Sequence, residues 1–273
     1  MGVHEIAASG FGGAAEIYDK ARPSYPLAVV KYFVDNLDIG PGHRVLDLAA
    51  GTGIFTGLIA NSGATLIACE PVAGMREVLR NKYPEIPTAA GVAENLPFAD
   101  GSLHAVTILQ ALHWFDGQRA TLELHRVLRS RGRVGFGWNA RDRSIEWVDL
   151  VWAIMDRVEK KAPWRNHRED QTGTTAVSQF GDPHGWTAGR AGVFVQGFSE
   201  VRYTRFFHEQ QTTPQGVIDR VASVSHVQIL PEPERQRVLD EVRDIVTNHP
   251  QTAGQNVLNL GYWTDCYWTE RLE

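Results

Sequence analysis

Two kinds of hydrophobic pattern alternate near the start of the chain. Residues 44–50 and 64–70 are short apolar runs without strict alternation, which is typical of parallel strands covered on both faces. Between them, residues 51–63 begin with Gly-Thr-Gly and continue with apolar positions at helical spacing, and Gly63 is a natural helix stop. The order predicts a strand, a glycine-rich turn, a helix and a second strand, which a right-handed crossover makes parallel.

The second half of the chain continues with strands and longer helical stretches. Residues 144–163 have a wide apolar face and predict an amphipathic helix, and residues 200–210 alternate as a strand does. Helices are predicted at residues 212–230 and 231–249, each opened near a proline. A final strand, rich in β-forming residues, is predicted within residues 256–272.

The composition is that of a globular protein with a buried core. Hydrophobic residues make up 43% of the 273 residues and charged residues 22%, so disorder is not expected. The net charge of −5, from 27 basic and 32 acidic residues, does not favour a nucleic-acid binder. Two cysteines are too few for a disulfide framework or a cysteine metal site, and the histidines lack metal-ligand spacing, so we predict no metal.

Targeting signals are not visible in the sequence. No basic stretch followed by a long apolar one opens it, and no apolar run is long enough to cross a bilayer. We therefore expect a cytoplasmic monomer or homodimer. Its expected partner is a small-molecule substrate, with no nucleic acid and no membrane.

The turn after the first strand is poor in side chains. Ala49, Gly51 and Gly53 would let a ligand approach the backbone, and the unpaired amides of the following helix would point toward that ligand. Glu70 ends the second strand, 19 residues after Gly51. An acid at that place can accept hydrogen bonds from both hydroxyls of a ribose. The pattern predicts a site for an adenosine-containing cofactor.

The turn also bears on which cofactor it would hold. A dinucleotide fingerprint has a third small residue where this chain has Thr56, and Asp47 would face a pyrophosphate unfavourably. A sulfonium cofactor carries positive charge and suits an acidic approach. The turn therefore favours S-adenosylmethionine, and NAD stays an alternative.

Motifs further along the chain point to a known family. Residues 93–98 read Ala-Glu-Asn-Leu-Pro-Phe, residues 110–115 read Gln-Ala-Leu-His-Trp-Phe, and residues 123–139 fit a helix, a glycine turn and a strand. Together with the turn and the segment at residues 15–26, they resemble the class I S-adenosylmethionine-dependent methyltransferases, in particular the small-molecule, type 11-like group. The resemblance covers residues 11 to 140 well and the rest weakly. It implies an α/β, Rossmann-like, seven-stranded and mostly parallel sheet with an antiparallel edge pair and an inserted helical cap.

The resemblance also implies roles for individual residues. Glu70 would hold the ribose, and Asp47 would order the turn and face the methionine part of the cofactor. His113 is the candidate catalytic residue, as a base or a substrate contact. The residues expected to bind S-adenosylmethionine are Tyr18, Arg22, Asp47, Ala49, Gly51, Gly53, Glu70, Pro71, Ala93, Glu94 and Gln110. The family often has Gly at the place of Ala49 and Asp at the place of Val92.

We predict three parts in the chain. Residues 1–140 form the cofactor-binding core with an N-terminal lid segment, residues 141–200 form a helical and loop insert, and residues 201–273 end the sheet with inserted helices. The loop of the insert is predicted at residues 164–192, and the helices would form a cap over the crevice and supply the substrate pocket. Candidate pocket residues are Trp147, Trp152, Trp164, His167, Trp186, His208 and His226.

These features support a methyltransferase that acts on a small, partly apolar molecule. Two alternatives stay open. One is a protein that binds S-adenosylmethionine without transferring a methyl group, and the other is an NAD-dependent oxidoreductase built on the same strand–helix–strand unit.

Overall fold

The chain forms two compact units in the computed structural model, which describes residues 19, 22–160 and 197–273. Within the described chain, the sheet unit comprises residues 24–139, 197–206 and 264–273. The helical unit comprises residues 19, 22–23, 140–160 and 207–263. The predicted loop and the candidates Tyr18, Trp164, His167 and Trp186 lie outside the described residues.

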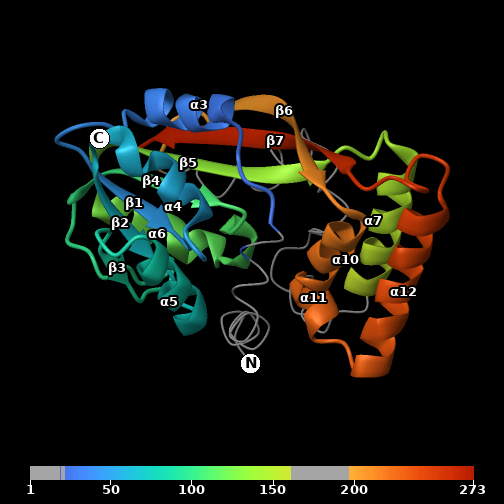
Figure 1. Cartoon of the computed structure of the whole chain (residues 1–273). Coiled ribbons are helices and arrows are strands. Elements are labelled where there is room, and N and C mark those ends of the chain that lie inside the picture. The colour runs from blue at the N-terminus through green and yellow to red at the C-terminus, as the bar shows by residue number, and fades with distance from the viewer. Residues whose placement is uncertain (1–18, 20–21, 161–196) are drawn as a thin grey trace. The chain divides into compact units, whose positions relative to one another are not determined.

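The described strands form one sheet of seven, in the order β3-β2-β1-β4-β5-β7-β6 (Figure 1). Parallel pairing joins β1 to β2 and β4, β2 to β3, and β4 to β5. The chain thus builds outward from β1 in both directions, which confirms the predicted Rossmann-like α/β sheet. The strands are β1 (Arg44–Leu48), β2 (Thr65–Cys69), β3 (Thr88–Ala89), β4 (Leu103–Leu109), β5 (Leu128–Arg141), β6 (Arg202–Thr212) and β7 (Leu258–Glu270).

Strand β7 runs antiparallel to its neighbours. The amide of Ser199, just before β6, donates to the carbonyl of Glu270 at the end of β7, at 2.8 Å. The amide of Arg271 donates to the carbonyl of Gly132, near the start of β5, also at 2.8 Å. The end of β7 therefore lies beside the beginnings of β5 and β6, which confirms the predicted antiparallel pair.

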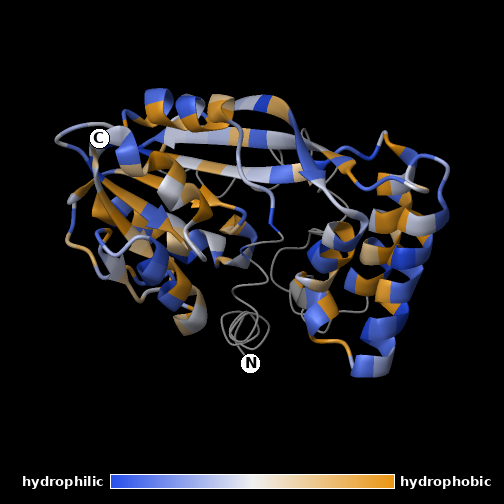
Figure 2. Ribbon diagram, viewed as in Figure 1, coloured by the Kyte–Doolittle hydropathy of each residue, from blue (hydrophilic) through white to orange (hydrophobic). Residues whose placement is uncertain are grey.

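Helices cover both faces of the sheet unit, because neighbouring residues of a strand point to opposite faces. Leu46 and Leu48 of β1 pack in one cluster with residues of α6, whereas Val45 packs in another with residues of α3 and α4. Figure 2 shows the central strands to be largely hydrophobic, as a doubly covered sheet requires. Gly63 has a φ of 82° and ends the helical turn after α4, as predicted. The helices are α3 (Leu27–Leu37), α4 (Ile54–Ile59), η1 (Ala60–Ser62), α5 (Ala73–Lys82), η2 (Leu112–Trp114) and α6 (Gly117–Val127).

The helical unit has its own core. Val151 of α7, Val217 of α10, Val227 of α11 and Val242 of α12 belong to one buried cluster. In the chain, α7 precedes β6 and the other helices stand between β6 and β7, as predicted from the sequence. That they cap the crevice stays a prediction. The helices are α7 (Glu146–Glu159), α10 (Pro214–Ala222), α11 (Ser225–Gln228) and α12 (Glu232–Asn248).

The prediction of one helix over residues 212–230 is wrong, since α10 ends at Ala222 and α11 begins at Ser225. The Ser223 hydroxyl donates to the carbonyl of Arg220 at 2.8 Å. Such a local bond from serine competes with the helical ladder and favours a break.

Candidate functional site

The turn after β1 has an unusual backbone. Ala49, Gly51 and Gly53 have φ angles of 54°, 59° and 82°, in the left-handed region. Gln110, the first residue after the neighbouring strand β4, has a φ of 63°. Two non-glycine residues in this costly conformation, Ala49 and Gln110, thus follow the carboxyl ends of adjacent parallel strands. Backbone strain gathers at functional sites, and ligands of doubly wound sheets bind at this edge.

Glu70 follows β2, and backbone amides fix its carboxylate. Oε2 accepts from the Gly51 amide at 3.0 Å, and Oε1 accepts from the Val72 amide at 2.8 Å. The residue is only 4% exposed. Burial raises the pKa of Glu70, while the two amide hydrogen bonds act against that rise. Each carboxylate oxygen keeps a further lone pair, so Glu70 can still accept hydrogen bonds from two ribose hydroxyls.

Arg76, on α5, hydrogen-bonds to the backbone at Glu70 and Pro71. Its Nη1 donates to the carbonyl of Glu70 at 2.7 Å and to the carbonyl of Pro71 at 2.6 Å. The guanidinium therefore fixes the backbone after β2, and its charge favours the ionised carboxylate. Arg76 was not among the residues predicted from the sequence. An arginine one turn into the helix that follows Glu-Pro is the signal that could have identified it.

Asp47 is buried, and its carboxylate hydrogen-bonds to two neighbouring elements. Its Oδ2 accepts from the Thr56 hydroxyl at 2.5 Å, and its Oδ1 accepts from the Thr107 hydroxyl at 2.8 Å. These bonds link β1 to α4 and to β4, on either side of the turn. Burial raises the pKa of Asp47 to about 6, although both hydroxyls lower it. The contact of Asp47 with the methionine part of a cofactor stays a prediction.

The two glycines of the turn have different surroundings. A Cβ at Gly51 would meet only Met75 Sδ, at 3.8 Å, so the space above it is open to a ligand. A Cβ at Gly53 would meet Leu79 at 3.0 Å and Tyr83 at 3.1 Å. Gly53 therefore admits the packing of α5 against the turn. Open space at Gly51 beside an acceptor carboxylate fits an adenosine-containing cofactor.

Comparison with known proteins agrees with this geometry. A family model described as "Methyltransferase domain" matches residues 46–136. The chain is 34% identical over 256 residues to an uncharacterized methyltransferase of Mycobacterium tuberculosis, covering 94% of this chain and 93% of the relative. The chain belongs to the methyltransferase family. The fold, the domain match and this relative make the protein a class I methyltransferase.

Two further likenesses extend the comparison. It is 37% identical over 136 residues to a demethylmenaquinone methyltransferase of Beutenbergia cavernae, covering 48% of this chain and 56% of the relative. Among solved structures, the cyclase SpnF has a TM-score of 0.56 at 12% identity, covering 100% of this chain and 97% of that chain. This second likeness shows the fold alone.

The segment after β3 carries the residues expected at the adenine. Ala93 is buried and packs in the core beneath α6. The Glu94 carboxylate accepts from the amide of Asp116 at 2.7 Å, which ties this segment to the residue that caps α6. Glu94 thus fixes the loop from which a backbone contact to adenine would come. The adenine contacts of Ala93 and Glu94 stay predictions.

The segment after β4 brings Gln110 and His113 to the same edge of the sheet. The Gln110 amide donates to the carbonyl of Gly137 at 2.8 Å, which holds the strained residue against β5. His113 lies in η2, with its ring 5.0 Å from that of Trp114. The catalytic role of His113 in the methyltransferase is not tested by this arrangement.

Two residues of the N-terminal segment 15–26 belong to different units of the structure. Tyr25 is buried in the sheet unit, with its ring edge-on to Phe55 at 5.5 Å, and thus packs in the core. Arg22 belongs to the helical unit, where Nη2 donates to the carbonyl of Ser223 at 3.4 Å. Its contact with a cofactor carboxylate stays a prediction.

The described pocket candidates lie within the helical unit. Trp147 and Trp152 are buried in its core. The ring of His208 stacks on Tyr262 at 5.6 Å, and burial lowers the pKa of His208. His226 lies in α11 beside several arginines. The two tryptophans thus pack as core residues, and the histidines offer polar atoms within an apolar unit.

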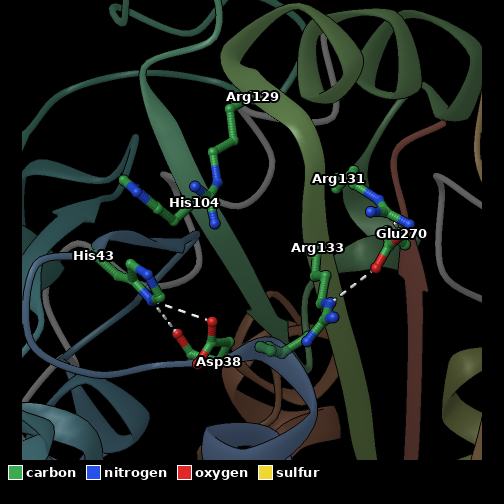
Figure 3. A pocket seen from close by; sticks show the side chains of 8 residues that line it. Asp38, His43, His104, Arg129, Arg131, Arg133 and Glu270 are labelled. Atoms are coloured by element: carbon green, nitrogen blue, oxygen red, sulfur yellow. Dashed lines mark hydrogen bonds and ion pairs between the residues drawn. The ribbon is translucent and has the colours of Figure 1, made fainter. Parts of the chain in front are cut away.

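A pocket lies at the opposite end of the parallel strands from Glu70 (Figure 3). The rings of His43 and His104 stack with centroids 4.5 Å apart, and Arg133 donates to Glu270 at 3.1 Å. His43 precedes β1, and His104 is the second residue of β4. The pocket therefore lies at the amino ends of parallel strands, at the opposite edge from Glu70, and we assign it no part in cofactor binding.

Two negative findings concern the described residues. No group of three or more His, Cys, Asp and Glu side chains in this part of the chain is placed to hold a metal ion. Among the helices of residues 22–160 and 197–273, none is long and apolar enough to span a membrane.

Proposed function

We propose that this methyltransferase uses S-adenosylmethionine to methylate a small molecule. The observation that carries the proposal is the position of Glu70. Its buried carboxylate accepts from the Gly51 amide beside open backbone, at the edge of the sheet where nucleotides bind.

Several residues at this edge of the sheet would contact different parts of the cofactor. Glu70 would accept from the ribose hydroxyls, and Arg76 keeps it in place through the backbone. The open approach at Gly51 would admit the sugar. Ala93 and Glu94 would bound the adenine, whereas Gln110 and Asp47 would line the methionine end, Asp47 through the order that it gives the turn.

The bound cofactor supplies an electrophilic methyl group on a sulfonium, with a neutral leaving group. The protein then has to orient the acceptor, exclude water and hold the acceptor in the reactive protonation state. His113, three residues after the strained Gln110, could accept a proton from an acceptor. An acceptor that is already an anion would not need that step.

A small-molecule acceptor is supported by two observations. The relative from Beutenbergia cavernae is named for demethylmenaquinone, a small molecule. The net charge of −5 does not favour a nucleic-acid substrate. The methylated atom is left open by both.

Calorimetric titration of the wild-type protein tests the proposal. We expect S-adenosylhomocysteine, the product form of the cofactor, to bind with a defined one-to-one heat, and NAD to give none. Binding of NAD without binding of S-adenosylhomocysteine would overturn the proposal in favour of an oxidoreductase.

A second candidate is a protein that binds the cofactor without transferring its methyl group. The likeness to SpnF, whose name is that of a cyclase, favours keeping it, because fold alone does not determine a reaction. Incubation with S-adenosylmethionine and a panel of small acids, phenols and amines separates the two. Release of S-adenosylhomocysteine with any acceptor supports methyl transfer.

A further inference from the structure

Cationic side chains gather inside the helical unit. Arg220 of α10 is only 4% exposed, and Arg141 ends β5. Arg22 reaches the same region, since it donates to the carbonyl of Ser223, three residues after Arg220. His226, on the next helix, completes what we call the arginine cluster: Arg22, Arg141, Arg220 and His226.

The polar atoms of the arginine cluster are incompletely satisfied by the described residues. Nε of Arg141, Nε and Nη1 of Arg220, and Nε2 of His226 are buried, and none of them has a hydrogen-bond partner within the described chain. The hydroxyl of Tyr262, which is fully buried, also has no hydrogen-bond partner within the described chain. Buried guanidinium nitrogens without acceptors are costly, so their retention calls for an explanation.

The ring of Trp152 stabilises the charge of Arg141 but offers its Nε no acceptor. Its guanidinium lies 4.7 Å from the centre of the Trp152 ring, which is a cation–π distance. Trp152 belongs to the apolar core of this unit, as do Tyr262 and Val221, the residue next to Arg220. The arginine cluster therefore borders an apolar core that contains aromatic rings.

The charges of the cluster act on one another. Burial and then the charge of Arg220 lower the pKa of Arg141 to about 9, with Arg22 adding to the effect. Burial and the same arginines lower the pKa of His226 to about 3, so His226 is neutral near pH 7. Among the described residues, the carboxylate that acts on Arg141 is that of Glu159. Arg141 and Arg220 thus each keep a buried guanidinium nitrogen that no acceptor of the described chain reaches, which leaves a place for two carboxylate groups.

We propose that the arginine cluster binds a small organic acid with at least two carboxylates. Guanidinium groups pair with carboxylates through two parallel hydrogen bonds, and Tyr262 and His226 would add neutral contacts to the same ligand. The ligand class is an aliphatic or aromatic polycarboxylic acid.

The carboxylate of the cofactor is a second source of the same chemistry. S-adenosylmethionine, however, also carries a sulfonium and an ammonium, which three arginines would repel. We therefore assign the cluster to the acid and not to the cofactor, and the two assignments make different predictions for a variant of Arg220.

The test compares Arg220→Met with wild type and with Arg237→Met. Arg237 lies on α12 of the same unit and is exposed, so its variant is matched in charge and in chemistry. Calorimetry and thermal unfolding are measured against succinate, citrate, inorganic phosphate and S-adenosylhomocysteine. We expect citrate or succinate to bind wild type and Arg237→Met and to raise their unfolding midpoints. Arg220→Met should bind them at least about tenfold more weakly, because a hydrogen bond to a charged group is lost.

A second readout separates binding from a structural role. Because Arg220 is buried among like charges, the unliganded Arg220→Met protein should unfold at the midpoint of wild type or above it. A lower midpoint with unchanged citrate binding would overturn the proposal. So would binding of phosphate alone, or the absence of binding by both acids. Loss of S-adenosylhomocysteine binding in Arg220→Met would assign the cluster to the cofactor instead. Failure of wild type to bind S-adenosylhomocysteine would refute the proposed function and leave the acid site standing.

Discussion

Asp47 shows how one buried acid orders the turn. Each of its carboxylate oxygens accepts from a threonine hydroxyl, one on α4 and one on β4. Thr56 could be read from the sequence only as a departure from the dinucleotide pattern. In the structure it is the donor that locks Asp47. Thr107 was not foreseen, because a single threonine in an apolar strand is compatible with ordinary packing.

The pKa of Asp47 leads to a pH prediction. It is raised by burial from 3.8 to about 6, so this residue stabilises the fold fully below pH 3.8 and loses that contribution as pH rises through 6. The loss is about 3 kcal/mol, from about 1.36 kcal/mol for each pH unit. Asp47→Asn should remove this slope from the free energy of unfolding between pH 4 and 6, measured by urea denaturation.

The exposed Asp35→Asn serves as the control, since it changes the same group on the surface of α3. An unaltered slope in Asp47→Asn would show that Asp47 does not titrate in this range.

At the scale of elements, periodicity predicted most of the fold. Apolar runs predicted the strands β1 and β2, and helical spacing predicted α7 and α12. The break at Ser223 escaped prediction, because it depends on one hydroxyl bond that spacing does not reveal. Strand β3 spans only Thr88 and Ala89, too few residues for a pattern. From the sequence, both turn glycines were expected to admit a ligand. In the structure, α5 packs over Gly53 and leaves Gly51 open.

The two glycines give a matched pair of variants. Gly53→Ala should lower the free energy of unfolding by about 2–4 kcal/mol, from left-handed strain plus crowding against Leu79 and Tyr83. Gly51→Ala should cost only the strain, about 1–2 kcal/mol, because no protein atom crowds the new methyl group. Urea denaturation measures both.

The same pair should rank oppositely in ligand binding. Gly51→Ala narrows the space through which a ligand reaches the backbone. We therefore expect it to weaken the binding of S-adenosylhomocysteine more than Gly53→Ala does. Equal loss of affinity in the two variants, or a greater loss in Gly53→Ala, would contradict the assignment of Gly53 to helix packing.

At the scale of the whole molecule, the comparisons cover the two units differently. The family model matches residues 46–136, which all belong to the sheet unit. The relative from Mycobacterium tuberculosis covers 94% of this chain, so the helical unit is part of that likeness. The cofactor edge could be identified from the sequence because a turn poor in side chains and an acid at the end of the next strand occur at a characteristic spacing. The sequence could not identify the arginine cluster, whose members come from four separate segments.

Ligands bound at the cofactor edge and at the arginine cluster should each raise the stability of the protein. S-adenosylhomocysteine at 100 times its dissociation constant should stabilise the whole protein by about 2.7 kcal/mol through mass action. An added organic diacid should stabilise it further, since it would occupy a different site. A fall in either effect when the other ligand is present would show that both compete for one site.

The central claim is that Glu70 holds the ribose of the cofactor, and one affinity measurement tests it. S-adenosylhomocysteine is titrated calorimetrically into wild type, Glu70→Gln and the exposed control Glu77→Gln. We predict that Glu70→Gln binds at least about tenfold more weakly, since a charged acceptor is lost, while Glu77→Gln matches wild type. Equal affinity in all three proteins would contradict the account.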